Sequence, residues 1–240
     1  MFATSGPQDR RHRRPLDALV GLPIARSAPG TAEASADASR RAAGLTAGQL
    51  IGEEMRQLLT IAPDVNPLAG QGGSEQKCLS TGRRSKVLIV WTTPEAEVSP
   101  TECHVKPGTP LFFSTLFAEC SSVEDPPFFG ATAEEQRACA LAFLNDPLLF
   151  DEILVQIDDQ PAVNIGLPKY LATSGQVSVD LPDPNILGVP DRHATFVAAA
   201  YSATLKPLPP GTHSITVTIV GGQFPGVSRA TVDVEPGQHR

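Results

Sequence analysis

The stretch "PLPPGTHSITVTIVGG", from Pro207 to Gly222, sets the first expectation for the fold. Three prolines and a glycine interrupt the chain before a run in which apolar and polar residues alternate. Such alternation is typical of a strand with one buried face, here the face of Ile215, Val217 and Ile219. The run "SRATVDV" repeats the pattern after "GGQFPG", so the two runs predict a closing hairpin.

Segments with strand character recur upstream of this hairpin. One of them, "ATFVAAAYSATL", is expected to place Phe196 and Tyr201 on opposite faces of a sheet. The chain also has 23 prolines and 20 glycines, which suit many turns between short elements. Roughly seven short strands separated by turns predict a mostly β chain, an antiparallel β-sandwich of Ig-like or jelly-roll-like type. The upstream strands are expected at Ser85–Thr93, Pro110–Cys120, Glu152–Ile157 with a short return strand, 175–182 and 194–205.

Two short helices are predicted beside the strands. Thr46 and Gln49 have the spacing of a capping box, in which side chain and backbone bond reciprocally at a helix start. The apolar stripe that follows contains Leu50, Ile51, Met55, Leu58 and Leu59, and Pro63 ends it. Thr132 and Glu135 repeat the box before a second helix that ends at 145–147.

Charge is unevenly distributed along the chain. Residues 1–44 hold seven arginines and four acids, whereas the whole chain has a net charge of −7. We expect 1–44 to be a disordered Arg/Ala-rich tail, 45–76 a helix and linker arm, and 77–240 the β-sandwich domain. The tail starts like a signal peptide, but Asp17 and Pro23 interrupt its apolar part, so no clear signal peptide is predicted. The acidic balance argues against nucleic-acid binding, and no apolar run approaches the about 20 residues that span a membrane.

Four cysteines, Cys78, Cys103, Cys120 and Cys139, lie in one window of the chain. None has Cys-x-x-Cys spacing, and their even number favours two disulfides formed in an oxidising compartment. Sequential pairing would close loops of moderate length. The other two connectivities, and four buried free thiols, remain open alternatives.

Catalytic motifs are absent from the sequence. There is no Gly-x-Ser-x-Gly elbow, Walker loop, dinucleotide-binding motif, His-x-His or His-Glu-x-x-His, and no cofactor is predicted. If the protein were an enzyme, its acids and bases would have to converge in space from separate segments. The candidate residues are Glu102, His104, Asp183, Asp191, His193 and His213.

The segment "DLPDPNILGVPD" carries oxygen ligands of the kind that calcium prefers, but its spacing departs from that of an EF-hand. Turns beside prolines explain the same residues, which are Asp180, Asp183, Asn185 and Asp191. His213 is interpreted as structural: its ring would cover the end of the sandwich while a ring nitrogen bonds a loop carbonyl.

Several segments, in order, resemble a group of uncharacterised exported bacterial proteins. They are "NP" at 66–67, Cys78, "VLIVW", "CHVKPGTPLFF", "LPDPNILGVP", Tyr201 and "PLPPGTHSI". The resemblance covers approximately Thr46 to Val220 and implies an extracytoplasmic β-rich domain, with no activity to transfer. This chain departs from the group in lacking tryptophans near the first helix and a recognisable signal peptide, and in having Asp159 where a glycine is usual.

These observations predict an extracytoplasmic or secreted, non-enzymatic binding or surface-interaction protein. Its partner would be an extracellular ligand or surface component. The alternative is a hydrolase or lyase acting on an extracellular polymer, which would require the candidate acids and histidines to meet in one site.

Overall fold

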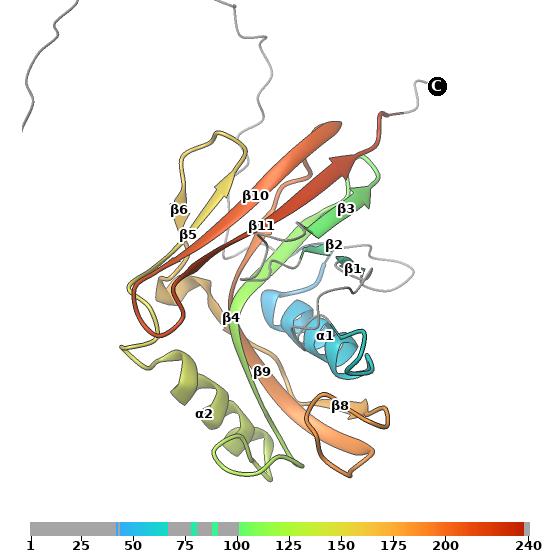
Figure 1. Cartoon of the computed structure of the whole chain (residues 1–240), viewed down its shortest axis with the longest axis vertical. Coiled ribbons are helices and arrows are strands. Elements are labelled where there is room, and N and C mark those ends of the chain that lie inside the picture. Colours follow the sequence, from blue (N-terminus) through green and yellow to red (C-terminus); the bar gives the residue numbers. More distant parts are fainter. Residues whose placement is uncertain (1–41, 43, 67–77, 81–87, 91–100, 238–240) are drawn as a thin grey trace, which may run out of the picture. The chain divides into compact units, whose positions relative to one another are not determined.

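The computed structural model of the chain describes residues 42, 44–66, 78–80, 88–90 and 101–237, all within one compact unit. This part of the protein is mostly β, with two sheets and two α-helices (Figure 1). Most of the predicted N-terminal tail, residues 67–76 of the predicted helix and linker arm, and the ends of the predicted Ser85–Thr93 strand lie outside the described residues. No described helix is long and apolar enough to cross a membrane.

The first sheet, called sheet 1, is built around two long antiparallel strands, β4 and β9. Its order is β1-β2-β4-β9-β7, and β8 also pairs with β9. A short 3-10 helix at Pro168–Tyr170 leads into β7. The strands are β1 (Cys78–Ser80), β2 (Leu88–Val90), β4 (Leu111–Ser121), β7 (Leu171–Thr173), β8 (Val177–Asp180) and β9 (His193–Leu205).

The second sheet, called sheet 2, contains the hairpin that the opening stretch predicts. Its order is β3-β11-β10-β5-β6, and β10 and β11 pair antiparallel along almost their whole length. The predicted hairpin of 152–157 with a short return strand is also present, as β5 and β6. The strands are β3 (Thr101–Val105), β5 (Glu152–Ile157), β6 (Val163–Asn164), β10 (Gly211–Val220) and β11 (Gly226–Val234).

Two strand pairs differ from the expected purely antiparallel arrangement. β2 pairs parallel with β4, and β3 pairs parallel with β11. Parallel neighbours need a crossover between them. Between β2 and β4 the chain passes through β3 in the other sheet, and β3 and β11 are far apart in sequence. The pattern of alternation within each strand could not reveal either pairing, and the Ig-like or jelly-roll-like type stays a prediction.

A bulge in β4 decides which side chains face which layer. The register with β9 shifts between Thr115 and Phe117, and the extra residue, Leu116, has a φ of 43°. One inserted residue moves all later side chains to the opposite face. Ala118 and Cys120 therefore join the core of Leu111 and Phe113, whereas Phe117 packs on the other side.

Sheet 1 has a separate apolar core on each of its faces. The first face packs against sheet 2 and helix α2 (Ala133–Leu144), with Phe113 and Tyr201 in this core. The second face packs against helix α1 (Ala47–Leu59), with Phe112 and Phe196 in that core. Phe196 and Tyr201 thus lie on opposite faces, as predicted. Figure 1 shows α1 and α2 on the two sides of β4 and β9.

Both helices begin at the predicted capping boxes. In α1 the Thr46 hydroxyl accepts from the Gln49 N–H, and the Gln49 side chain accepts from the Thr46 N–H. Thr132 and Glu135 make the same reciprocal bonds at the start of α2. Each box satisfies two backbone donors that would otherwise lack partners at a helix start.

The α1 helix lies unusually close to β7 because of a glycine. A Cβ atom at Gly48 would sit 2.1 Å from the backbone oxygen of Thr173, and one at Gly52 would sit 3.1 Å from the Ser174 Cβ. Only a residue without a Cβ permits the first of these contacts. The absence of side chains at these two glycines therefore allows α1 to pack closely on sheet 1.

The two disulfides follow the sequential pairing, one of the three connectivities that the sequence allowed. Cys78–Cys103 joins β1 to β3 and therefore sheet 1 to sheet 2, with a Cα–Cα distance of 5.7 Å. Cys120–Cys139 joins β4 to α2 at 6.1 Å. Both bonds cross-link elements around the first core of sheet 1.

Candidate functional site

The residues proposed for catalysis from the sequence are distributed over two distant regions. His193 begins β9, whereas His104 and His213 lie on β3 and β10 of the other sheet. The length of β9 alone is about 40 Å, at about 3.3 Å per residue. The Glu102 side chain is not among those that the structure describes. The fold therefore does not gather the three described histidines into one site.

His104 and His193 each lie beside an aspartate on an exposed surface. His104 Nδ1 is 3.3 Å from Asp233 Oδ2, and 70% of the His104 side chain is exposed. His193 Nδ1 is 2.8 Å from Asp180 Oδ1 and is similarly exposed. Exposed pairs of this kind contribute little to stability and leave both groups solvated.

His213 is held much more firmly than the other two histidines. Its Nδ1 lies 2.8 Å from Asp158 Oδ2, and its Nε2 lies 2.8 Å from the carbonyl oxygen of Pro209. Only 12% of the side chain is exposed. The bond to a loop carbonyl is present as predicted, and the histidine lies two residues after Gly211, where β10 begins.

The two partners of the His213 ring are the Asp158 carboxylate and the backbone carbonyl of Pro209. Asp158 also accepts from the backbone N–H of Ser214, at 2.8 Å. The imidazole thereby ties the 158–160 turn to the start of β10. Both ring nitrogens are thus engaged by groups of the protein itself, which supports the structural interpretation.

The four residues weighed as calcium ligands have other bonding partners or are exposed. Asp180 pairs with His193, and Asp183 accepts from Arg192. Asn185 is buried, and its side chain donates to the Val189 carbonyl and accepts from the Val189 N–H. Asp191 is exposed. Within the described ranges, no three His, Cys, Asp or Glu side chains are grouped so that they could hold a metal ion.

Two acidic sites that the sequence analysis missed lie on the α1 face of sheet 1. The first is Glu54, which is only 3% exposed between α1 and the sheet. Ser114 Oγ donates to its Oε2 at 2.7 Å, while Oε1 is buried without a hydrogen-bond partner. Burial raises the pKa of Glu54 to about 7, against the smaller lowering effect of the Ser114 bond.

The second acidic site is a pair of carboxyl groups, Glu119 and Glu124, near the end of β4. Burial raises the pKa of Glu119 well above its usual value, and the charge of Glu124 and a hydrogen bond to it raise it further. Ser121 Oγ donates to Glu124 Oε2 at 2.8 Å. The protonated form of Glu119 is therefore favoured by burial and by the neighbouring carboxyl group.

Sequence signals for both sites existed but were weak. Glu54 interrupts the apolar stripe of the first helix at a position that faces the core, between Ile51 and Leu58. Glu119 reaches the α1 face only because the β4 bulge changes the phase of alternation. No pattern in the sequence reveals that bulge.

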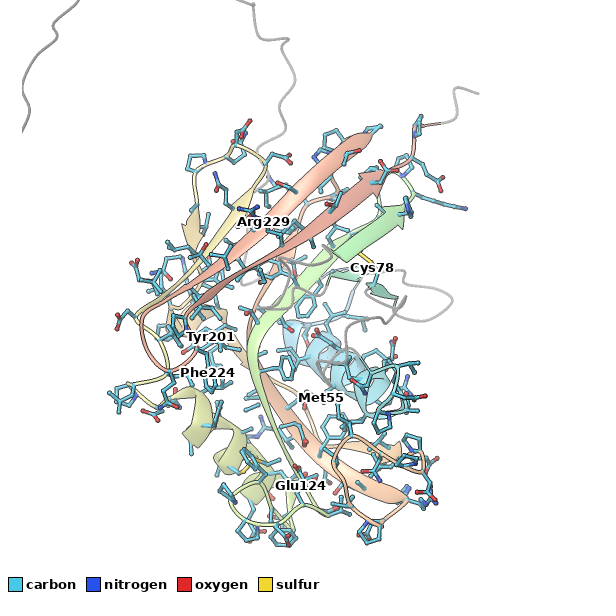
Figure 2. All side chains as sticks on the ribbon, in the orientation of Figure 1. Met55, Cys78, Glu124, Tyr201, Phe224 and Arg229 are labelled. Carbon is cyan, nitrogen blue, oxygen red and sulfur yellow. A yellow bond between two sulfur atoms is a disulfide. The ribbon has the colours of Figure 1, made fainter. Side chains whose placement is uncertain are left out.

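Exposed apolar side chains gather near the 146–151 loop that follows α2. The loop itself presents Leu148, which is 68% exposed. The tip of the β10–β11 hairpin contacts it, since the Gln223 N–H donates to the Leu149 carbonyl at 3.1 Å and the Asp151 N–H donates to the Val220 carbonyl at 2.8 Å. Figure 2 labels Phe224 at this hairpin tip, beside α2. We call Leu148, Leu167, Val220, Phe224 and Val227 the apolar surface.

Two observations place Leu167 and the aromatic side chains near this surface. Gly166, next to Leu167, packs so closely on the Phe150 ring that a Cβ there would lie 2.8 Å from it. At the end of α2, the Phe143 ring is 6.3 Å from that of the exposed Phe128. The apolar exposure therefore continues towards the loop that precedes α2.

In comparisons with known proteins, the chain matches no family model and no curated protein.

Proposed function

We propose that this protein is an extracytoplasmic, non-enzymatic binding protein that engages an apolar element of a ligand or surface component. The observation that carries the proposal is the apolar surface around the 146–151 loop. Exposed apolar side chains that gather on one part of a surface can mark an interaction site, and here the 146–151 loop and the hairpin tip, which are joined by backbone hydrogen bonds, both present them. The proposed layering, two packed sheets of a sandwich, is a common scaffold for binding proteins.

The compartment is supported by the disulfides. The structure contains no free cysteine among its described residues, and the bonds Cys78–Cys103 and Cys120–Cys139 are consistent with an oxidising environment outside the cytoplasm. Disulfides persist there because no reducing thiol pool removes them. The Cys120–Cys139 bond also fixes α2 on β4, so it holds one border of the apolar surface in place.

The proposed surface is also rigidly presented. Gly222 has a φ of 67°, and a Cβ there would lie 2.3 Å from the Leu149 oxygen, so the hairpin tip fits tightly on the loop. Gln223 Nε2 adds a bond to Asp146 Oδ2 at 3.3 Å. A surface fixed before binding loses little conformational entropy when a partner docks.

Site-specific photo-crosslinking in the native host tests this proposal. A photoreactive amino acid at Leu148 or Phe224 should give a discrete adduct, whereas one at the exposed Ser178 of β8 should not. Affinity for the identified partner should then fall at least about tenfold in Leu148→Ser/Phe224→Ser at unchanged melting temperature, as expected when two apolar anchors are lost. Equal labelling at all three positions, or none at Leu148 and Phe224, would contradict the proposal.

The alternative, a hydrolase or lyase acting on an extracellular polymer, is favoured by one observation, the Glu119–Glu124 pair. A carboxyl group whose pKa is raised by burial and by a second carboxyl group can act as a general acid. This alternative predicts that the protein cleaves at least one member of a panel of extracellular polysaccharides or peptides. Activity should fall in Glu119→Gln and Glu124→Gln but persist in Glu134→Gln, an exposed acid of α2. Activity that is unchanged in both pair variants would exclude this site.

A further inference from the structure

The α1 helix contacts sheet 1 through a carboxyl group placed inside an apolar interface. Glu54 lies on the buried side of the helix with Leu50, Ile51 and Leu58, all of which belong to the second core of sheet 1. Met55, the next residue, belongs to the same core. A fully buried carboxyl group is rare, because ionisation in such surroundings is costly unless a partner compensates the charge.

The hydrogen bonds around Glu54 are incomplete. Ser114 donates to one carboxyl oxygen, and the other is buried without a partner. Ser202, the cross-strand partner of Ser114 in the β4–β9 ladder, also has a buried hydroxyl without a hydrogen-bond partner. Two unmatched polar atoms thus lie at the interface between α1 and these strands, which is a costly arrangement for an ionised carboxylate.

No positive charge compensates Glu54 from the described parts of the elements that pack on it. α1 packs against β4, β7, β8 and β9. Arg56, on α1 itself, is engaged by Glu53 at 2.8 Å. On β8, Asp180 is exposed and pairs with His193 of β9. β7 carries no charged residue, and the charged group of β4 is another acid, Glu119.

We propose that α1 is a protonation-dependent latch, which stays docked on sheet 1 while Glu54 carries its proton and loosens when that proton passes to solvent. Loosening would expose the second core, including Phe112 and Phe196, without breaking either disulfide. Since burial raises the pKa of Glu54 to about 7, the transition falls in a range that an extracytoplasmic protein meets. This inference is independent of the apolar surface, which lies around α2 and the β10–β11 tip.

The direction of the pH effect follows from linkage. In the docked state the group holds its proton up to about pH 7, whereas in the undocked state it loses the proton near its usual value of 4.5. Docking is therefore strongest below about pH 4.5 and weakens progressively as the pH rises through about 7. Above that value the penalty is constant.

Hydrogen exchange of the α1 amides, corrected for the intrinsic pH dependence of exchange, measures the opening directly. The opening constant of residues 47–59 should rise on the order of a hundredfold between about pH 4.5 and above pH 7, from the size of the pKa shift. In Glu54→Gln the rise should disappear. Glu53→Gln, on the same helix, is the matched control and should keep the rise.

A second variant keeps the proposal testable if Glu54→Gln does not fold. Ser114→Ala removes the hydrogen bond that lowers the pKa of Glu54, so the midpoint of α1 opening should move to higher pH. Opening that is independent of pH in the wild-type protein, or a rise retained in Glu54→Gln, would overturn the latch. A midpoint that does not move in Ser114→Ala would also count against it.

Discussion

The two faces of sheet 1 are held by different kinds of interaction. On the face towards sheet 2 and α2, an apolar core is crossed by two disulfides. On the face towards α1, no disulfide joins the described residues, and the interface contains Glu54, Ser114 and Ser202. The same two strands, β4 and β9, contribute side chains to both faces.

A buried interface is therefore not necessarily one that is fixed covalently. Both faces bury their side chains almost completely, yet only one is covalently fixed. Disulfides restrict the unfolded chain whatever the pH, whereas a buried acid makes docking depend on protonation. The disulfide-linked face is thus expected to keep its stability at all pH values, whereas the stability of the α1 face should change with pH.

The largest loss of stability is expected from removing the disulfide between β4 and α2. Replacing Cys120 and Cys139 by alanine should lower the free energy of unfolding by about 3 kcal/mol, because the closed loop no longer restricts the unfolded chain. Urea denaturation under non-reducing conditions measures the loss. A loss below about 1 kcal/mol would contradict this expectation.

On the α1 face, stability is expected to depend on pH. The raised pKa of Glu54 means that the folded state binds an extra proton between about pH 4.5 and 7, so stability should fall as the pH rises through this window. The difference between wild type and Glu54→Gln should change by on the order of 3 kcal/mol across it. Chemical denaturation at several pH values measures this difference, and parallel curves for the two proteins would contradict the prediction.

Gly48→Ala tests whether α1 must approach β7 closely. The added Cβ would meet the Thr173 backbone oxygen at 2.1 Å, so the helix has to move and stability should fall by about 2 kcal/mol. Gly175→Ala is the control, since a Cβ there has no atom within 4 Å. The melting temperatures of both variants test this expectation. An equal change in the two would show that the contact between α1 and β7 tolerates a side chain at position 48.

The smallest loss of stability is expected from removing the two hydrogen bonds of His213. His213→Ala removes the bonds to Asp158 and Pro209 and should cost about 1 to 2 kcal/mol while any partner binding remains intact. His104→Ala, at a largely exposed position, should change stability by less than about 0.5 kcal/mol. Lost binding at unchanged stability in His213→Ala would overturn its structural interpretation.

Local features of the fold were accessible from the sequence. The capping boxes at Thr46 and Thr132 position both helices correctly, and alternation identifies the hairpin of 211–234. These patterns act over a few residues, so the chemistry that creates each element is contained in the segment itself. The pairing of the cysteines remained one choice among three until the positions of β1, β3, β4 and α2 were known.

The candidate sites were less accessible. The histidines and acids singled out from the sequence lie in separate regions, because β9 carries the chain from one to the other. Glu119 and Glu124 become a carboxyl pair only at the end of a bulged strand, and the apolar surface forms only where the hairpin tip meets the loop after α2.

By itself, then, the sequence determined the type of most elements, because capping, turn and alternation signals depend on neighbours in the chain. Tertiary structure alone decided the parallel pairs, the two faces of sheet 1 and the raised pKa of Glu54. Those properties depend on which distant segments exclude water from one another, and water exclusion sets both the apolar cores and the pKa of a buried acid.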